Sequence, residues 1–398
     1  MYRGRSALSD CSSCLLFIGL LVLSTFLYRC RKPELTGAGN PATAGLNPQA
    51  KNAAAAPQIT SFVHPGVLNT QASLQYAANQ VNGNDAGRLA SYQKVLDFIN
   101  SHTYPTSFPS VVVVGSNGAT SPSKNQIRSD AELVYALALR WTKTGDFTYA
   151  SQAIFILNGW AKNFTGYQLL NSSTTPQQPS LEASWTTPGF VAAAEIIRYY
   201  KVNGQGSGWS DADIQQFSNY LNLVKNNYIN NTPTNFNNNW DASAGYAKMA
   251  IGIFLNSTTV YQNGYNFIMQ YLPIIIAPSG TISEYCDRKD CVHYQYSLTA
   301  FAYAAELARI QGDNSIWTAN GNLLSAGYDY QRTAYGGGGG CQYCSTSSPV
   351  FPGVEVAYNY YKTGNLGYLR GLQAPLGVPN DNTFLGFTTY THYNVPGL

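Results

Sequence analysis

Residues 130–146 read DAELVYALALRWTKTGD, and this stretch decides the fold class. Its apolar residues between Ala131 and Trp141 recur at spacings of three and four, which predicts a helix with a buried face. Gly145 is suited to a left-handed C-cap, and Asp146 can cap a second helix, predicted over residues 150–160. A helix, a tight turn and another helix form an antiparallel αα-hairpin.

The same pattern continues along the chain. Helical periodicity returns over residues 190–200, 214–224, 244–254, 261–272 and 298–310, and glycine turns like the first follow at 311–313 and 362–365. Strand alternation is scarce. Recurring hairpins predict an all-α fold, an (α/α) toroid or incomplete barrel whose inner helices line a cleft on one face. A stacked solenoid is the alternative, but no fixed-period repeat is visible.

Composition and charge exclude some classes of protein. The chain has 398 residues, 44% hydrophobic and 11% charged, which is typical of a globular protein with a large core. Its formal charge of +3 comes from an excess of basic residues before position 35, and the remainder is balanced. No broad basic face for nucleic acid is therefore expected. Thirty Tyr and six Trp suit stacking on sugars or packing in a helical core.

The N-terminus has the features of an export signal. An uncharged stretch between Asp10 and Arg29 contains the apolar run 15–23. We interpret residues 1–34 as a signal peptide or signal anchor, with membrane anchoring possible through 14–28, residues 35–57 as a flexible linker, and 58–398 as the toroid domain. The domain is then secreted, or membrane-anchored and lumenal or extracellular. Sequons at Asn163, Asn171, Asn230 and Asn256 agree with export.

Cysteine spacing agrees with an oxidising compartment. Four cysteines lie in two loops and are expected to form disulfides: Cys286, Cys291, Cys341 and Cys344. Spacing leaves the pairing open, and our hypothesis is that Cys286 bonds to Cys291 and holds the loop that carries Arg288. A four-thiolate zinc site is the alternative. We expect no metal and no cofactor.

Two segments carry the residue types that break an acidic polysaccharide by β-elimination. An amide and a guanidinium can neutralise a uronate carboxylate, which acidifies the C5 proton, while a phenol or imidazole removes that proton and protonates the departing O4. The first segment is 237–240, with Asn238, Asn239 and Trp240, and the second is 284–296, with Arg288, His293, Tyr294 and Tyr296. Structural alternatives are an N-cap for the first segment and an ion pair of Arg288 with a neighbouring acid.

These residues belong to a longer resemblance. The motifs are His64-Pro65-Gly66, the run 130–141 with Thr144-Gly145-Asp146 and Tyr149-Ala150, Asn238-Asn239-Trp240, and Arg288 followed by His293-Tyr294. Their order and spacing, from about Phe62 to Phe387, resemble the alginate-lyase superfamily of polysaccharide lyases. The resemblance implies an (α/α) toroid and metal-independent β-elimination of 1,4-linked polyuronates such as alginate or glucuronan, leaving a 4,5-unsaturated sugar end.

The resemblance also implies residue roles. Asn239 is similar to the amide that neutralises the substrate carboxylate, Arg288 to its cationic helper, and Tyr294 to the catalytic phenol. One departure is that Trp240 stands where similar lyases carry a histidine. The base then comes from the tyrosine acting twice, which favours syn elimination, from His293, which permits anti elimination, or from a distant histidine.

The phase of one helix leaves the phenol open. Tyr294 and Tyr296 project about 200° apart on a helix that begins near His293, so only one of them faces the cleft. His293 also has a structural reading, as a histidine that orients the arginine or a carboxylate.

Three further residues are candidate substrate contacts. Gln178 and Trp185 fall in a Pro- and Thr-rich stretch that either binds sugar or forms a surface loop, and Glu355 either points into the cleft or sits at a helix N-terminus.

Two other functions compete with a monomeric polyuronate lyase. One is a glycoside hydrolase on the same toroid, with two carboxylates among Asp130, Glu132, Asp241 and Glu284. The other is a carbohydrate-binding protein in which Trp240 marks lost catalysis.

Overall fold

The structure is a computed structural model that describes residues 59–373, 375–377 and 383–398. The predicted signal segment, membrane anchor and linker lie outside the described residues. Among the helices of the described part, none combines the length and apolar character needed to cross a membrane.

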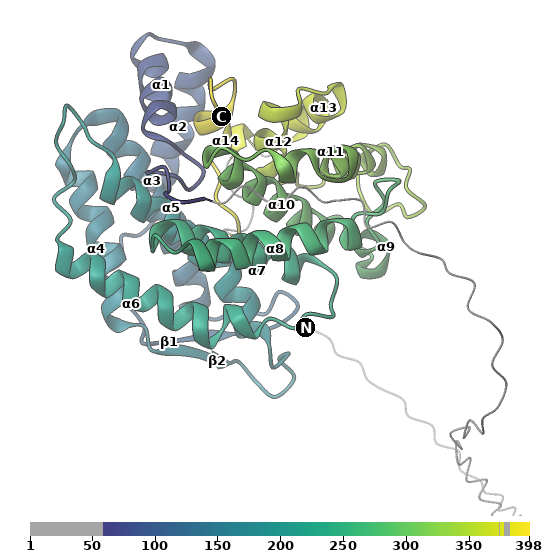
Figure 1. Ribbon diagram of the computed structural model, residues 1–398, viewed down its shortest axis with the longest axis horizontal. Helices are drawn as coiled ribbons and strands as arrows, with labels where there is room; N and C mark the ends of the chain where they lie inside the picture. Colours follow the sequence, from purple (N-terminus) through teal and green to yellow (C-terminus); the bar gives the residue numbers. More distant parts are fainter. Residues whose placement is uncertain (1–58, 374, 378–382) are drawn as a thin grey trace, which may run out of the picture. The chain divides into compact units, whose positions relative to one another are not determined.

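Helices make up almost all of the regular structure (Figure 1). The α-helices of the described residues are α1 (Gln71–Asn82), α2 (Ala86–Ser101), α3 (Pro122–Thr144), α4 (Phe147–Asn163), α5 (Gln178–Tyr199), α6 (Asp211–Asn227), α7 (Asn239–Phe254), α8 (Thr258–Ile275), α9 (Glu284–Arg288), α10 (His293–Ile310), α11 (Ser315–Tyr335), α12 (Gly353–Tyr361), α13 (Gly364–Leu372) and α14 (Thr388–His392). Strands β1 (Val111–Val114) and β2 (Gly166–Leu169) pair in parallel.

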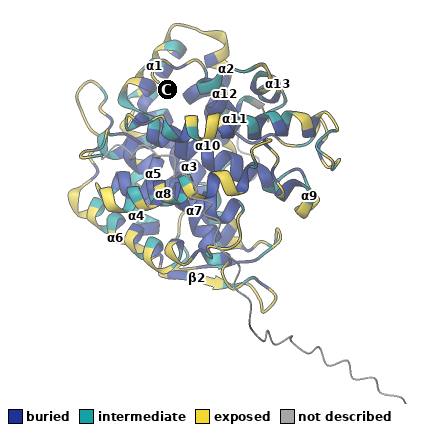
Figure 2. Ribbon diagram, turned by 45° about the vertical axis from the view of Figure 1, so that its right-hand side comes forward, coloured by how far each residue is buried: buried dark blue, intermediate teal, exposed yellow. Residues whose placement is uncertain are grey.

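The long helices form two concentric layers. Helices α3, α5, α7, α10 and α12 contact one another in that order, and α14 and α1 complete the circle back to α3. Outside them, α4, α6, α8, α11 and α13 each pack on a helix of the inner layer or on its neighbour. Figure 2 shows the inner helices buried and the outer ones exposed along one face. The predicted (α/α) toroid is confirmed, and the ring excludes the stacked solenoid.

Sequence patterns explain the two layers. Helix α7 is buried on all sides except at Lys248, as expected for a helix that is apolar all round. Outer helix α8 instead buries a stripe at spacings of three and four that includes Tyr261, Tyr265, Ile268 and Leu272.

The predicted caps are largely confirmed. Gly145 is left-handed with φ 70°, and the Asp146 side chain accepts a hydrogen bond from the backbone N–H of Thr148 at 2.8 Å. Gly312 also has a positive φ, of 90°. The turn at 362–365 was assigned wrongly: Lys362 is the left-handed residue, Thr363 is the N-cap, and Gly364 already begins α13.

Glycines let α7 and α8 approach closely. A Cβ atom added at Gly264 would lie 2.6 Å from the carbonyl oxygen of Gly245 and 2.6 Å from the backbone nitrogen of Met249. Neither backbone atom can move without shifting a helix, so the position requires glycine.

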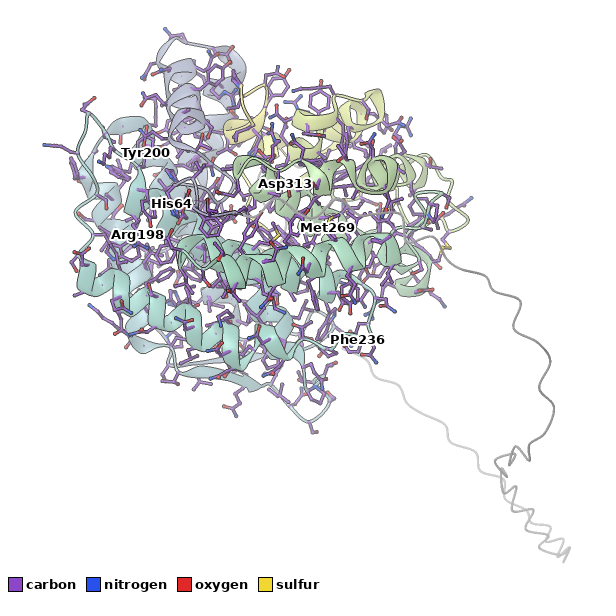
Figure 3. The ribbon with its side chains drawn as sticks, in the orientation of Figure 1. His64, Arg198, Tyr200, Phe236, Met269 and Asp313 are labelled. Carbon is purple, nitrogen blue, oxygen red and sulfur yellow. A yellow bond between two sulfur atoms is a disulfide. The ribbon has the colours of Figure 1, made fainter. Side chains whose placement is uncertain are left out.

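The segment before α1 is tied to the inner layer. His64 Nδ1 lies 2.8 Å from Oε2 of the buried Glu195 on α5, and the Gly66 backbone N–H donates to the same oxygen. Figure 3 shows His64 close to Arg198 of the same helix. These contacts are structural and lie away from the cavity described next.

Candidate functional site

A cavity of about 610 Å³ opens where several inner helices begin. Its wall includes the first turns of α3, α5, α7 and α10, together with the loop after β1 and the end of α9. The N-terminal end of a helix carries unpaired N–H groups and a partial positive charge. Four such ends converging on one cavity favour an anionic ligand.

Asn239 is the first residue of α7 and lines this cavity. It is only 1% exposed, and its Nδ2 donates to Glu284 Oε1 at 2.5 Å. Its neighbour Asn238, predicted to bind substrate, instead caps the helix: its side chain accepts from the N–H of Trp240, and it is absent from the cavity wall. The predicted N-cap is therefore confirmed for Asn238, and the residue that lines the cavity is Asn239.

Arg288 ends the short helix α9 and reaches the same cavity. Its side chain is exposed, and it forms none of the ion pairs within the described part of the chain. The structural reading of Arg288 as an ion-pair partner is therefore not supported, and its guanidinium is available to a ligand.

Two disulfides hold the loop that carries Arg288, but our predicted pairing was wrong. Cys286 bonds to Cys341 and Cys291 bonds to Cys344, so neither bond closes the short loop. Both join this loop to the glycine-rich segment after α11. The bonds exclude a four-thiolate zinc site, because all four sulfurs are used. Sequence spacing could not reveal this pairing, since partners more than 50 residues apart meet only in the fold.

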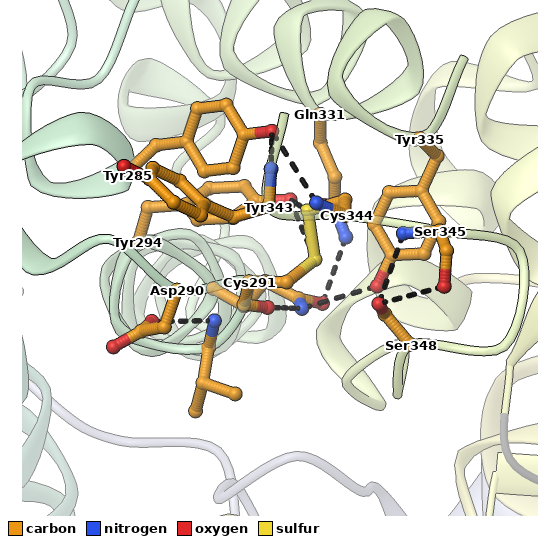
Figure 4. The surroundings of a disulfide bond; sticks show 12 residues. Tyr285, Asp290, Cys291, Tyr294, Gln331, Tyr335, Tyr343, Cys344, Ser345 and Ser348 are labelled. Atoms are coloured by element: carbon orange, nitrogen blue, oxygen red, sulfur yellow. Dashed lines mark hydrogen bonds between the residues drawn. A yellow bond between two sulfur atoms is a disulfide. The ribbon is translucent and has the colours of Figure 1, made fainter. Parts of the chain in front are cut away.

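The structure separates the two candidate phenols. Tyr294 is fully buried, and its hydroxyl lies 3.4 Å from Cys344 Sγ, in the packing around the disulfide (Figure 4). Burial raises its pKa well above 10, because the phenolate would lose its hydration. Tyr296 lies on the opposite side of α10 and lines the cavity. The phenol that can meet a ligand is therefore Tyr296, and the predicted placement of Tyr294 is corrected.

His293 lines the cavity one turn before Tyr296. Its Nδ1 lies 2.6 Å from Asp290 Oδ2, while Asp290 Oδ1 accepts from the backbone N–H groups of Val292 and His293. A carboxylate on Nδ1 fixes the ring and keeps a proton there, so that Nε2 is the nitrogen left to exchange a proton. The arrangement suits a general base.

Aromatic rings form another part of the wall. Trp185 and Tyr296 lie 4.9 Å apart between ring centroids, and Trp240 lies 5.1 Å from the exposed Phe236. Trp185 also donates through Nε1 to Ser243 Oγ. Rings of this kind can stack on the apolar face of a sugar.

Gln178 and Trp185 lie on a helix, so the predicted surface loop was wrong. Both belong to α5, which begins at Gln178 and continues through Pro188, and both line the cavity. Burial of nearly the whole helix overrides the unfavourable propensity of proline.

Glu355 does not reach the cavity wall. It lies in the first turn of α12, fully buried, where its oxygens accept from Arg370 Nε at 2.6 and 2.8 Å and from Thr389 Oγ1 at 2.8 Å. The predicted substrate contact is wrong, and the helix N-terminal reading holds.

The carboxylates of the competing hydrolase hypothesis are also directed elsewhere. None of the four lines the cavity. Among the described residues that do line it, the one acidic residue is Asp290. Asp130 accepts from Trp160 Nε1, Glu132 from the Gly386 N–H, Asp241 from the Asn238 N–H, and Glu284 from Asn239. A hydrolase needs two carboxyl groups on either side of one bond, and the described part of the cavity wall offers only one.

Sequence reasoning missed the far side of the cavity. The loop 115–120 and the α3 residues Lys124 and Arg128 line it. Arg128 pairs with Glu182 through two hydrogen bonds, of 2.6 and 2.7 Å. The apolar periodicity of α3 predicts only its buried face, and no sequence motif indicates that Lys124 and Arg128 line a cavity.

Comparisons with solved structures identify the fold. Alginate lyase A1-III from Sphingomonas species A1 superposes with a TM-score of 0.63 and 17% identity, covering 85% of this chain and 99% of that one. An alginate lyase from Bacteroides ovatus gives 0.63 and 13%, covering 82% and 99%. A tyrosine-to-phenylalanine variant of alginate lyase A1-III, complexed with tetrasaccharide, gives 0.63 and 16%, covering 85% and 99%.

Sequence comparison identifies the family. A search of curated proteins finds no match. The sequence model described as alginate lyase matches residues 74–337, which is more than half of the chain. The chain therefore belongs to the alginate lyase family.

Proposed function

We propose that the protein is a polysaccharide lyase that cleaves 1,4-linked polyuronates, alginate or glucuronan, by β-elimination. The observation that supports it most is the content of the cavity: Asn239, Arg288, His293 and Tyr296 come from three segments and meet at converging helix N-termini. The structurally similar alginate lyase A1-III variant in complex with tetrasaccharide agrees with a sugar chain as the ligand.

The roles follow from chemistry. Asn239 and Arg288 bind the uronate carboxylate and stabilise the charge that develops on it as the C5 proton leaves. His293 Nε2 accepts that proton, since Asp290 holds the other ring nitrogen. Tyr296 then protonates O4 of the departing sugar. For a substrate whose C5 proton lies on the other face of the ring, Tyr296 can serve in both steps.

The proposal includes the location of the protein. A chain with an apolar N-terminal segment and disulfides suits a secreted protein or one anchored through residues 14–28, acting as a monomer on a polysaccharide outside the cell.

A panel of polymannuronate, polyguluronate and glucuronan tests the function. Elimination creates a conjugated double bond, so ultraviolet absorbance and new reducing ends must rise together on at least one polymer. New reducing ends without the absorbance would indicate hydrolysis. Binding without either would indicate a carbohydrate-binding protein.

A further inference from the structure

Beneath the cavity wall, a buried glutamate holds the amide that faces the ligand. Glu284 is 5% exposed and lies between α7 and α10. Its Oε1 accepts from Asn239 Nδ2 at 2.5 Å, and its Oε2 accepts from the Asn239 backbone N–H at 3.3 Å and from Ser297 Oγ at 3.1 Å. These three hydrogen bonds all come from residues at the start of α7 or α10.

The Asn239 amide is only half satisfied in this arrangement. Its Oδ1 is buried and has no hydrogen-bond partner among the described residues, a state that typically costs about 1–3 kcal/mol. Rotating the amide by half a turn would exchange its oxygen and nitrogen with little change of shape. The rotated amide would place Oδ1 against Glu284 Oε1, where two acceptors meet unless the carboxyl carries a proton.

Which amide atom is left for the ligand therefore depends on one proton. When Glu284 is ionised, the Asn239 Nδ2 group donates to it, and the Asn239 Oδ1 atom points away from Glu284. With Glu284 neutral, its O–H can donate to Oδ1, and both N–H groups of Nδ2 are released. A uronate carboxylate needs donors and is repelled by the oxygen.

We propose that Glu284 is a proton-linked positioning residue, whose neutral form turns the Asn239 amide so that Nδ2 donates to the substrate carboxylate, and that substrate binding therefore takes up one proton. The inference rests on the proposed function, since it concerns the same carboxylate subsite. The proton moves from solvent to a Glu284 oxygen, and no covalent bond of the substrate is involved.

The environment of Glu284 makes the neutral form accessible. Burial, opposed by the hydrogen bonds from Asn239 and Ser297 and by the charge of Arg288, raises its pKa to about 7. The other titratable groups of these elements are Asp287, which lies on α9 with Glu284, Asp290 in the turn after α9, Asp241 in the first turn of α7, and His293 and Tyr296 at the start of α10.

A bound uronate raises the pKa of Glu284 further. Two carboxylates on opposite sides of one amide repel each other, so the buried one accepts a proton. Affinity should then fall by up to about tenfold per pH unit above the pKa of the free protein.

Calorimetry measures this proton directly. Binding of a tetramannuronate to the Tyr296→Phe variant, in which we expect turnover to be blocked, is followed in buffers of different ionisation enthalpy. We expect uptake of about one proton per bound molecule at pH 8. With Glu284→Gln added, affinity should persist, because the glutamine Nε2 can donate to Asn239 Oδ1, while the uptake and the pH dependence of affinity disappear.

Controls separate the outcomes. Asp130→Asn removes another buried acid with a raised pKa, outside the cavity, and should leave the uptake unchanged. Equal uptake with and without Glu284→Gln would assign the proton to another group and overturn the proposal. If the Tyr296→Phe protein with Glu284 unchanged took up no proton on binding at any pH between 6 and 9, the proposal would be overturned. This outcome needs no folded Glu284→Gln variant. Absence of binding to any uronate would instead contradict the proposed function.

Discussion

Trp240 follows Asn239 at the position where the resemblance predicts a histidine, and the fold brings another imidazole to the same cavity. His293 comes from the start of α10 and is held by Asp290 at 2.6 Å. Trp240 cannot accept a proton, so in the proposed mechanism it contributes only an apolar part of the cavity wall. The chemistry of the missing histidine is thus available from a segment more than 50 residues away in the sequence.

If His293 is the base, His293→Gln should lower kcat by about 10²–10⁴-fold on the preferred polyuronate, with KM changed much less. Asp290→Asn should lower kcat by a smaller factor and shift its pH profile, because the ring would no longer be fixed in one tautomer. Steady-state kinetics across pH measures both. His102→Gln, outside the cavity, is the matched control, and a His293→Gln enzyme as active as this control would exclude the role.

At this scale, sequence identified the residue types but not every position. The place of Asn239, Arg288 and His293 at one cavity could be predicted because their order along the chain follows the resemblance, while their roles stay a prediction. The choice between Tyr294 and Tyr296 could not be made, because it depends on which face of α10 the disulfide loop covers. Asp290 became meaningful only when its contact with His293 was known.

Secondary-structure elements were predicted well where apolar periodicity and caps agree, as in α3 and α4. Helix α5 was missed over its first turns, because Pro188 and the threonines around it are typical of a loop, and only the surrounding ring explains why they are helical. The disulfide pairing likewise depends on elements that meet only in the folded protein.

Close packing of α7 against α8 predicts an unusually sensitive glycine. Gly264→Ala should lower the free energy of unfolding by about 1–3 kcal/mol, since the added methyl meets two backbone atoms. Gly371→Ala is the control: it lies on α13 with open space around it, and should be neutral or stabilising by up to about 1 kcal/mol. Urea unfolding of both variants measures the difference, and equal stabilities would contradict the packing argument.

The disulfide Cys286–Cys341 predicts a separation of activity from folding. Replacing both cysteines by serine should lower kcat by about tenfold or more, because the segment 284–291, which carries Arg288, would lose one of its two covalent connections to the segment after α11. Circular dichroism should show an unchanged helix content. Full activity in the double variant would show that the bond does not position Arg288.

For the molecule as a whole, the sequence was sufficient to predict the ring of helical hairpins but not which carboxyl groups are buried inside it. Burial raises the pKa of Asp130 and Asp241 to about 6 and that of Glu284 to about 7. The folded protein therefore holds protons that the unfolded chain has released. Each of these three carboxyl groups should contribute stability that is greatest below about pH 4 and is lost as the pH rises through 6 and 7, the reverse of a salt-bridged carboxylate. The buried His392, whose pKa is lowered to about 3, contributes in the opposite direction below about pH 6.5.

Thermal unfolding between pH 4 and 8 measures this dependence. Asp130→Asn keeps an acceptor for Trp160 Nε1 and removes the ionisable group, so it should raise the unfolding free energy at pH 8 by about 1–3 kcal/mol and leave it almost unchanged at pH 4. A melting temperature that increases from pH 5 to pH 8 in the unmodified protein would have the wrong sign for these pKa shifts.

The central claim is that the cavity at the N-termini of α5, α7 and α10 performs β-elimination with Tyr296 as its phenol. The most direct test compares Tyr296→Phe with Tyr294→Phe by ultraviolet absorbance on the polyuronate that the unmodified protein cleaves. Each change removes one oxygen and keeps the ring. Tyr296→Phe should lose at least about 10²-fold in kcat while still binding substrate, and Tyr294→Phe should stay within about tenfold of the unmodified protein. An active Tyr296→Phe beside an inactive Tyr294→Phe would contradict the account.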